Sequence, residues 1–209
     1  MRHLAEAWLR TTHAVGARDD VAGAGAELLG RWAEPQRRYH DLAHLDAVLR
    51  HVDELADEAE NAVDVRLAAW FHDAVYDPTL RDNEARSALL ATTVLSGMRV
   101  HDDHIGEVVR LITLTATHDP VDGDRNGAVL CDADLAVLAG SEAAYRRYTD
   151  AVREEYAHLD DPAFRAGRAA VLRSLIERPA LFRTDHGRLH WEQPARANIT
   201  SELERLAGR

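Results

Sequence analysis

The sequence predicts an all-α fold that forms a single helical domain. Apolar residues recur at helical spacing along most of the chain, and no useful length of it alternates apolar and polar residues as a half-buried strand would. The clearest case is 41–57, where one helical stripe collects Leu42, Leu45, Val48, Leu49, Val52 and Leu55. A chain of 209 residues, 46% of them hydrophobic, suits one domain over 1–209.

Further helices are expected on both sides of this segment. Asp82 and Ser141 are suitable N-cap residues, and Pro162 suits the first turn of a helix. The segments 119–127 and 178–190 are expected to be loops, and neither has the composition of a flexible linker. The expected helices cover 3–16, 20–32, 64–75, 83–97, 103–117, 142–158, 163–177 and 192–206.

Composition narrows the classes of function. The formal net charge is −11, and all 25 basic residues are arginines, so general nucleic-acid binding is not expected and a small ligand is favoured. The N-terminus lacks a basic-then-apolar signal and no long uncharged apolar stretch occurs, so we expect a cytoplasmic protein without membrane contact. Because Cys131 is the single cysteine, a metal would have to be held by nitrogen and oxygen. A homodimer is left open.

Several imidazoles and carboxylates fall on apolar stretches from four segments of the chain. Each alone has an ordinary explanation: His118 as a partner of a helix C-terminus, His40 bonded to backbone, Asp132 as a cap of the following helix. Together, unpaired buried groups at about 1–3 kcal/mol each would consume much of a typical folding free energy. A shared divalent cation would satisfy them all. The groups are His40 and His44, the His72–Asp73 pair within the expected helix 64–75, His118, and Asp132 with Asp134.

These residues lie in ordered blocks, "RRYHDLAHLDAVL", "AAWFHDAVYDPTLRDNEARSA", "CDADLAVLAG", "YRRYTDAVREEY" and "EQPARANI". Over about residues 30–206 the blocks resemble the HD-domain superfamily of metal-dependent phosphohydrolases, in particular its small predicted branch. The resemblance implies an HD-domain-like helical bundle with a metal site between helices. It implies that His44, His72, Asp73 and Asp134 hold the metal, with Asp132 as a supporting or capping residue.

The implied activity is hydrolysis of a phosphate ester or anhydride of a small metabolite or nucleotide by a metal-activated water. The divalent ion could be Mn, Fe, Mg, Co, Ni or Zn, and Asp73 could be part ligand and part proton acceptor. His40 and His118 could complete a dinuclear centre or contact the substrate phosphate. A single metal is expected, because Asp119 follows His118 where relatives often carry another histidine or a small residue. The alternatives are a diiron oxygenase of the same superfamily and a non-catalytic nucleotide sensor.

Other polar residues near these blocks are candidates for supporting roles. Glu84 could orient the attacking water or simply favour the start of its helix. Arg37 and Arg38 directly precede His40, and either could bind the substrate phosphate or be an ordinary surface arginine.

One carboxylate shares an apolar helical face with tyrosines. Glu155 lies on the face of Tyr145, Tyr148 and Tyr156, where a lone charge would be costly. Pairing with an arginine further along the chain is the expected solution. The two candidates are Arg168 and Arg196.

Overall fold

The computed structural model describes residues 2–208, and within them it contains ten α-helices and no strand. The prediction of an all-α fold is confirmed. Among these residues no helix is both long and apolar enough to span a bilayer. The helices are α1 (Arg2–Ala14), α2 (Val21–Trp32), α3 (Leu42–Glu54), α4 (Ala62–Phe71), α5 (Asn83–Gly97), α6 (Asp102–Leu114), α7 (Arg125–Leu135), α8 (Glu142–Glu155), α9 (Asp161–Ile176) and α10 (Glu192–Leu206).

Most predicted helices are present with shifted ends. Ser141 caps α8, since its hydroxyl accepts the N–H of Ala144, and Pro162 lies in the first turn of α9. Asp82 is the N-cap residue of α5, as predicted, but its side chain makes no capping hydrogen bond. The segment predicted as 64–75 ends as a helix at Phe71.

Helix α7 was not predicted, and the expected loop 119–127 runs into its first turn. The reason is its central position. It packs against α3, α4 and α6, so residues on most of its circumference are buried. Polar residues such as Asn126 and Asp132 are buried together with the apolar ones, so the sequence of α7 has no separate polar face and no 3.6-residue pattern to reveal it. The other expected loop, 178–190, likewise contains the start of a short π-helical turn, Gly187–Trp191.

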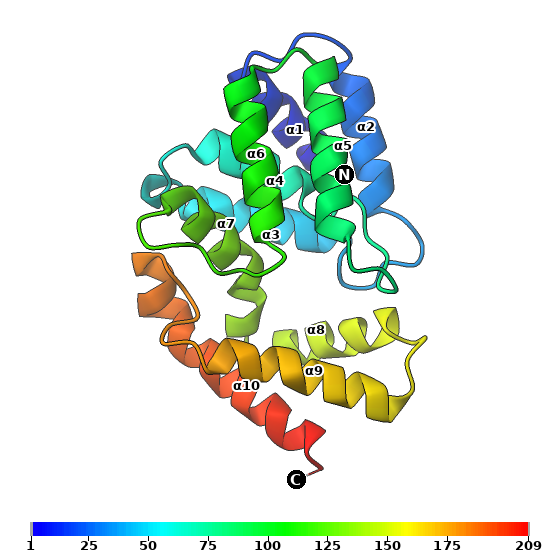
Figure 1. Cartoon of the computed structure of the whole chain (residues 1–209), viewed down its shortest axis with the longest axis vertical. Helices are drawn as coiled ribbons and strands as arrows, with labels where there is room; N and C mark the ends of the chain where they lie inside the picture. Colours follow the sequence, from blue (N-terminus) through cyan, green and yellow to red (C-terminus); the bar gives the residue numbers. More distant parts are fainter. Residues whose placement is uncertain (1, 209) are drawn as a thin grey trace.

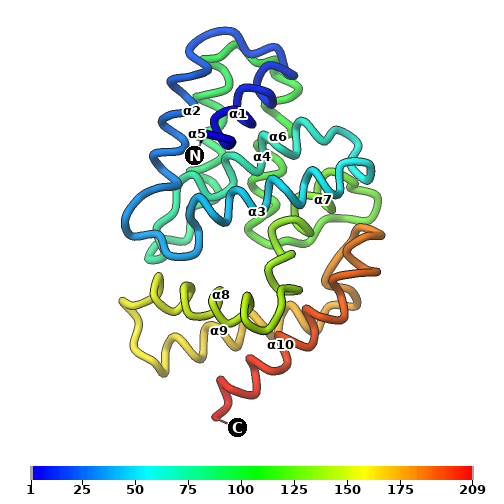
Figure 2. Tube along the Cα trace, turned by 180° about the vertical axis from the view of Figure 1, so that it is seen from behind, coloured from blue at the N-terminus to red at the C-terminus, as the bar shows by residue number. Residues whose placement is uncertain are grey.

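The helices form two hydrophobic cores. Helices α1 to α7 enclose the larger one, and α8 to α10 with the short 3-10 helix Ala136–Ala139 enclose the smaller. Figure 1 shows α8, α9 and α10 below the upper helices, with the chain passing down through α7. Viewed from behind, α3 crosses the molecule beside α7 (Figure 2). Trp191 packs against both cores. Organisation as one domain stays a prediction.

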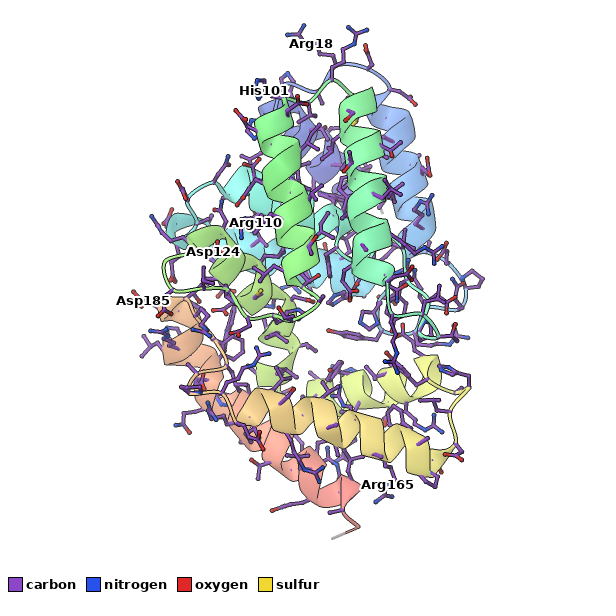
Figure 3. The ribbon with its side chains drawn as sticks, in the orientation of Figure 1. Arg18, His101, Arg110, Asp124, Arg165 and Asp185 are labelled. Atoms are coloured by element: carbon purple, nitrogen blue, oxygen red, sulfur yellow. The ribbon has the colours of Figure 1, made fainter. Side chains whose placement is uncertain are left out.

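A pair of charged residues fixes the beginning of α7. Arg110 of α6 donates from both terminal nitrogens to the carboxylate of Asp124, at 2.7 and 3.0 Å, and the two side chains lie together in Figure 3. Asp124 also accepts the N–H of Gly127 at 2.8 Å and so caps the helix. With this end anchored to α6, the other end of α7, which carries Asp134, is held between α3 and α4.

Candidate metal centre

Three side chains from different parts of the sequence converge where α3, α4 and α7 pack together. They are His44, His72 and Asp134, and one nitrogen or oxygen of each lies within 4.8 Å of the other two. The Nε2 atoms of the two histidines are 3.3 Å apart, and Oδ1 of Asp134 lies 3.1 Å from Nε2 of His44 and 3.7 Å from Nε2 of His72. The structure therefore brings together three of the four predicted ligands in one group.

The start of α3 places His44. Asp41 caps this helix by accepting the N–H of Ala43 at 2.8 Å and that of His44 at 3.2 Å. His44 thus sits in the first turn of α3, with its side chain 4% exposed and its ring 4.7 Å from that of Tyr39. Burial lowers the pKa of His44 and outweighs the raising effect of Asp134. The neutral imidazole is the form that binds metals.

The His72–Asp73 pair lies just beyond the end of α4 rather than inside a helix, which corrects the prediction. The backbone of His72 is still helical and its N–H reaches the carbonyl of Ala68, but the chain then turns. Nδ1 of His72 donates to the carbonyl of Ala69 at 2.9 Å, so in the neutral imidazole, the form that binds a metal, Nε2 carries the lone pair and faces the cluster. The ring packs 5.4 Å from that of Trp32 and is 1% exposed.

Asp73 lies at the edge of the three-residue group. Its Oδ2 is 3.3 Å from Nε2 of His72 and 3.9 Å from Nε2 of His40. Burial opposes ionisation of Asp73, but the charges of both histidines outweigh it and lower its pKa. Burial likewise opposes protonation of His72, and the carboxylates of Asp73 and Asp134 raise its pKa well above the usual value. The carboxylates thus create a field that favours a positive charge at this point.

The two aspartates of α7 have different surroundings. Asp134 faces the cluster, whereas Asp132 is fully buried and accepts the N–H groups of Arg183 and Thr184 and the hydroxyl of Thr184 at 2.6–2.9 Å. Asp132 does not cap a following helix, because it lies inside α7. Its role is to hold the loop before α10 against the bundle.

His118 reaches the same carboxylate from the other side. Its Nε2 lies 2.7 Å from Oδ2 of Asp134, and its backbone adopts a left-handed conformation with φ of 48° after α6 has ended. Arg178 fixes this turn by donating to the carbonyls of His118 at 2.6 Å and Thr117 at 2.8 Å. The structure therefore brings His118 to the cluster, as predicted, through its bond to Asp134.

His40 is held by Glu155 of α8, a partner that sequence reasoning missed. Nδ1 of His40 lies 2.6 Å from Oε2 of Glu155, which also accepts the hydroxyl of Tyr76 at 3.1 Å. The other carboxylate oxygen accepts three successive backbone N–H groups, those of residues 38 to 40, at 2.8–2.9 Å. The apolar face around Glu155 signalled a buried partner, but the predicted pairing with Arg168 or Arg196 is wrong, because these bind Glu202 and Glu192.

The pairing of Glu155 with His40 predicts a loss of stability in acid. Burial opposes ionisation of Glu155, but its bonds to His40 and to backbone N–H groups prevail and lower its pKa from 4.5 to about 2. A lowered carboxyl pKa stabilises the fold above the unfolded value and loses that contribution as pH falls towards the folded value. Between pH 4.5 and 2 the free energy of unfolding should therefore fall by on the order of 3 kcal/mol through this group.

Urea unfolding of wild type and Glu155→Gln across this pH range measures the effect. The variant is expected to be less stable near neutral pH and to show a shallower decline in acid. Glu154→Gln is the matched control, because its side chain is 65% exposed on the same helix. Parallel pH profiles for wild type and Glu155→Gln would contradict the assignment.

Of the residues predicted to bind the substrate or orient water, one is buried and the other two lie nearer the surface. Arg37 has a side chain with 0% exposure and donates to the carbonyls of His40, Asp73 and Ala74. It positions the turns around the cluster, which corrects the prediction that it binds phosphate. Arg38 is half exposed and lies beside Glu154 at 3.5 Å, so its role in phosphate binding stays a prediction. Glu84 lies in the first turn of α5, and its predicted role in orienting water also stays a prediction.

The residues at the cluster fit a divalent cation. The His44 and His72 nitrogens are close enough for both to reach one ion at about 2.1 Å. Imidazole and carboxylate are ligands for Zn, Fe, Ni, Co and Mn, and no thiolate is among the donors. The carboxylates of Asp73 and Asp134 would balance the charge of the ion. We found no match to this chain among protein-family models, curated proteins or solved structures.

Proposed function

We propose that this protein is a metal-dependent phosphohydrolase of the HD-domain superfamily, cleaving a phosphate ester or anhydride of a small metabolite or nucleotide. The observation that carries the proposal is the convergence of His44, His72 and Asp134, with two more imidazoles in contact with the neighbouring carboxylates. The order of the sequence blocks supports the same assignment. The group also lines a cavity of 540 Å³ through Asp134, which gives a ligand access.

His44, His72 and Asp134 would hold the ion, and Asp73 could join them. A bound divalent ion would lower the pKa of a coordinated water and polarise a phosphoryl oxygen. Without that positive charge, the carboxylates of Asp73 and Asp134 would repel an anionic phosphate. The proposed activity is therefore strictly metal-dependent.

The remaining residues of the site would handle protons. Asp73 would accept a proton from the attacking water, because its Oδ2 lies between the candidate ligand His72, at 3.3 Å, and His40, at 3.9 Å. Burial opposes protonation of His40, but Glu155 and Asp73 prevail and raise its pKa, so His40 can carry a proton towards the leaving oxygen. His118, bonded to Asp134, lines the cavity where the phosphoryl group would lie.

The direct test is metal analysis of protein purified without added metal, followed by a screen of phosphorylated metabolites. Hydrolysis should disappear after chelation and return when a divalent ion is added back. Turnover by the chelated protein would contradict the proposal. A coloured protein with two irons would favour a diiron oxygenase, and nucleotide binding without hydrolysis would favour a sensor.

A further prediction concerns the number of metals. Because the described residues contain one three-residue group and His118 bonds Asp134, we expect one equivalent in wild type and in His118→Ala, with turnover lost only in the variant. Metal titration followed by activity assays measures both quantities. His158→Ala, which removes an exposed imidazole, is the control. Two equivalents in wild type that fall to one in His118→Ala would show a dinuclear centre instead.

A further inference from the structure

A cavity begins at the candidate metal centre and extends along α8 and α9. Its volume is 540 Å³, within the range of small-molecule sites. His40, His118 and Asp134 line one end. Most of the remaining wall comes from the 3-10 helix Ala136–Ala139, α8 and α9, and Figure 1 shows α8 and α9 below the upper helices. A ligand with one end at the metal centre would therefore place its other end against α8 and α9.

The wall beyond the metal centre is mainly apolar and contains four aromatic rings. Tyr39 and Tyr148 pack edge to face, with ring centroids 4.6 Å apart, next to the metal centre. Tyr156 and Phe164 line the part formed by the end of α8 and the start of α9, with centroids 6.2 Å apart. Aromatic walls of this kind favour a flat apolar ligand body through stacking and edge-to-face contacts.

The two cationic side chains in the same wall already have partners. Arg168 donates to both carboxylate oxygens of Glu202, at 2.8 and 3.1 Å, and to the hydroxyl of Tyr148 at 2.9 Å. Arg178 donates to the carbonyls of His118 and Thr117. A chain of further phosphates would need guanidinium forks or ammonium groups directed at it. These two arginines instead hold the helices and the turn that shape the cavity.

We infer that the substrate is a phosphate monoester with a flat aromatic body, an inference that rests on the proposed function. Its phosphoryl group lies at the metal centre and its body lies in the aromatic cavity. Hydrolysis breaks the ester P–O bond and forms a P–O bond to the water oxygen. A proton passes to the leaving oxygen, and the products are an aromatic alcohol and inorganic phosphate. Substrates with two or three linked phosphates are poorly accommodated.

A second cavity presents the competing possibility. It has a volume of 360 Å³, shares Tyr39, Asp134 and Tyr148 with the first, and contains Arg38 and Arg147. A substrate with several phosphates could extend in this direction. Arg147→Ala therefore tests the alternative, because it should leave an aromatic monoester unaffected and weaken only a polyphosphate.

Gly167 allows the aromatic cavity to be filled without disturbing the metal centre. It lies in α9 and lines the cavity, and a Cβ atom added there meets no other atom within 4 Å. Gly106 in α6 is the matched control, being equally open but outside the lining of either cavity. Leucine at either position should raise helix stability slightly, because glycine is a poor helix former.

Steady-state kinetics with 1-naphthyl phosphate, glycerol phosphate and pyrophosphate tests the inference. Wild type should prefer the naphthyl ester. Gly167→Leu should raise the KM for the naphthyl ester by about tenfold, because the leucine side chain would occupy part of the apolar pocket. The KM for glycerol phosphate should change little. Gly106→Leu should change neither. The inference would be overturned if wild type showed no preference for the naphthyl ester, or if Gly167→Leu affected both esters equally. It would also be overturned by a preference for pyrophosphate that Arg147→Ala removes.

A binding measurement separates this inference from the proposed function. Calorimetric titration with naphthylphosphonate and methylphosphonate, neither of which is hydrolysed, should show tighter binding of the naphthyl compound and its loss in Gly167→Leu. If no phosphate is hydrolysed but this selective binding is seen, the phosphohydrolase proposal fails and the aromatic cavity stands. If hydrolysis occurs and the two phosphonates bind equally, the function stands and the aromatic cavity is rejected.

Discussion

Replacing His72 by alanine is expected to abolish metal retention and hydrolysis while leaving the helical content largely intact. The Nε2 lone pair of His72 is fixed towards the cluster by the bond from Nδ1 to the carbonyl of Ala69. Alanine removes this ligand, and water cannot take its place with the same orientation, because the His72 side chain is only 1% exposed. Activity should fall by more than the 10–100-fold that loss of a ligand's supporting partner typically costs. Elemental analysis, circular dichroism and an assay measure the three quantities.

The control is His13→Ala, which removes an exposed imidazole from α1. It should retain the metal and the activity of wild type. Normal metal content in folded His72→Ala would reject the candidate centre. Asp73→Ala is informative beside it: loss of the metal would make Asp73 a ligand, whereas retention with loss of turnover would make it a proton acceptor.

Substituting Asp134 and Asp132 by asparagine should produce opposite phenotypes. Asp134→Asn is expected to lose metal affinity with a smaller change in stability, because Asp134 is one of the three converging donors. Asp132→Asn should keep the metal and lose stability. Its amide nitrogen cannot accept hydrogen bonds from Arg183 or Thr184, and each unsatisfied buried partner costs about 1–3 kcal/mol.

Metal titration and thermal unfolding of both variants measure the two effects. For Asp132→Asn, a loss of about 1–3 kcal/mol in the free energy of unfolding corresponds to a fall in Tm of several degrees, at about 2–4 °C per kcal/mol in a chain of this length. The unfolding should be compared in chelated protein, so that lost metal binding does not contribute. Equal metal loss in both variants, or reversed effects, would show that the assignment of the two aspartates is wrong.

The candidate site could be predicted in part because its polar residues lie in apolar stretches of the sequence. His44 lies on the apolar side of its helix, and His72 and Asp134 lie in apolar runs, so each required a partner. The partners themselves came from distant segments. The partner of Glu155 could not be predicted in this way. Its apolar helical face indicated a buried bond, but the position of α8 relative to the turn before α3 decided that the bond is made with His40 and not with an arginine.

The amino-acid sequence by itself determined the all-α class, most of the helices and the identities of the residues that need a common partner. Those features are set by local periodicity and by the cost of burying polar groups, which act within short segments. Only the tertiary structure decided that α7 is a helix, that His72 and Asp73 follow α4 rather than lie inside it, and that Asp132 binds the loop before α10 instead of capping a following helix. A segment buried on most sides has no polar face, and the direction of its side chains depends on how neighbouring helices pack.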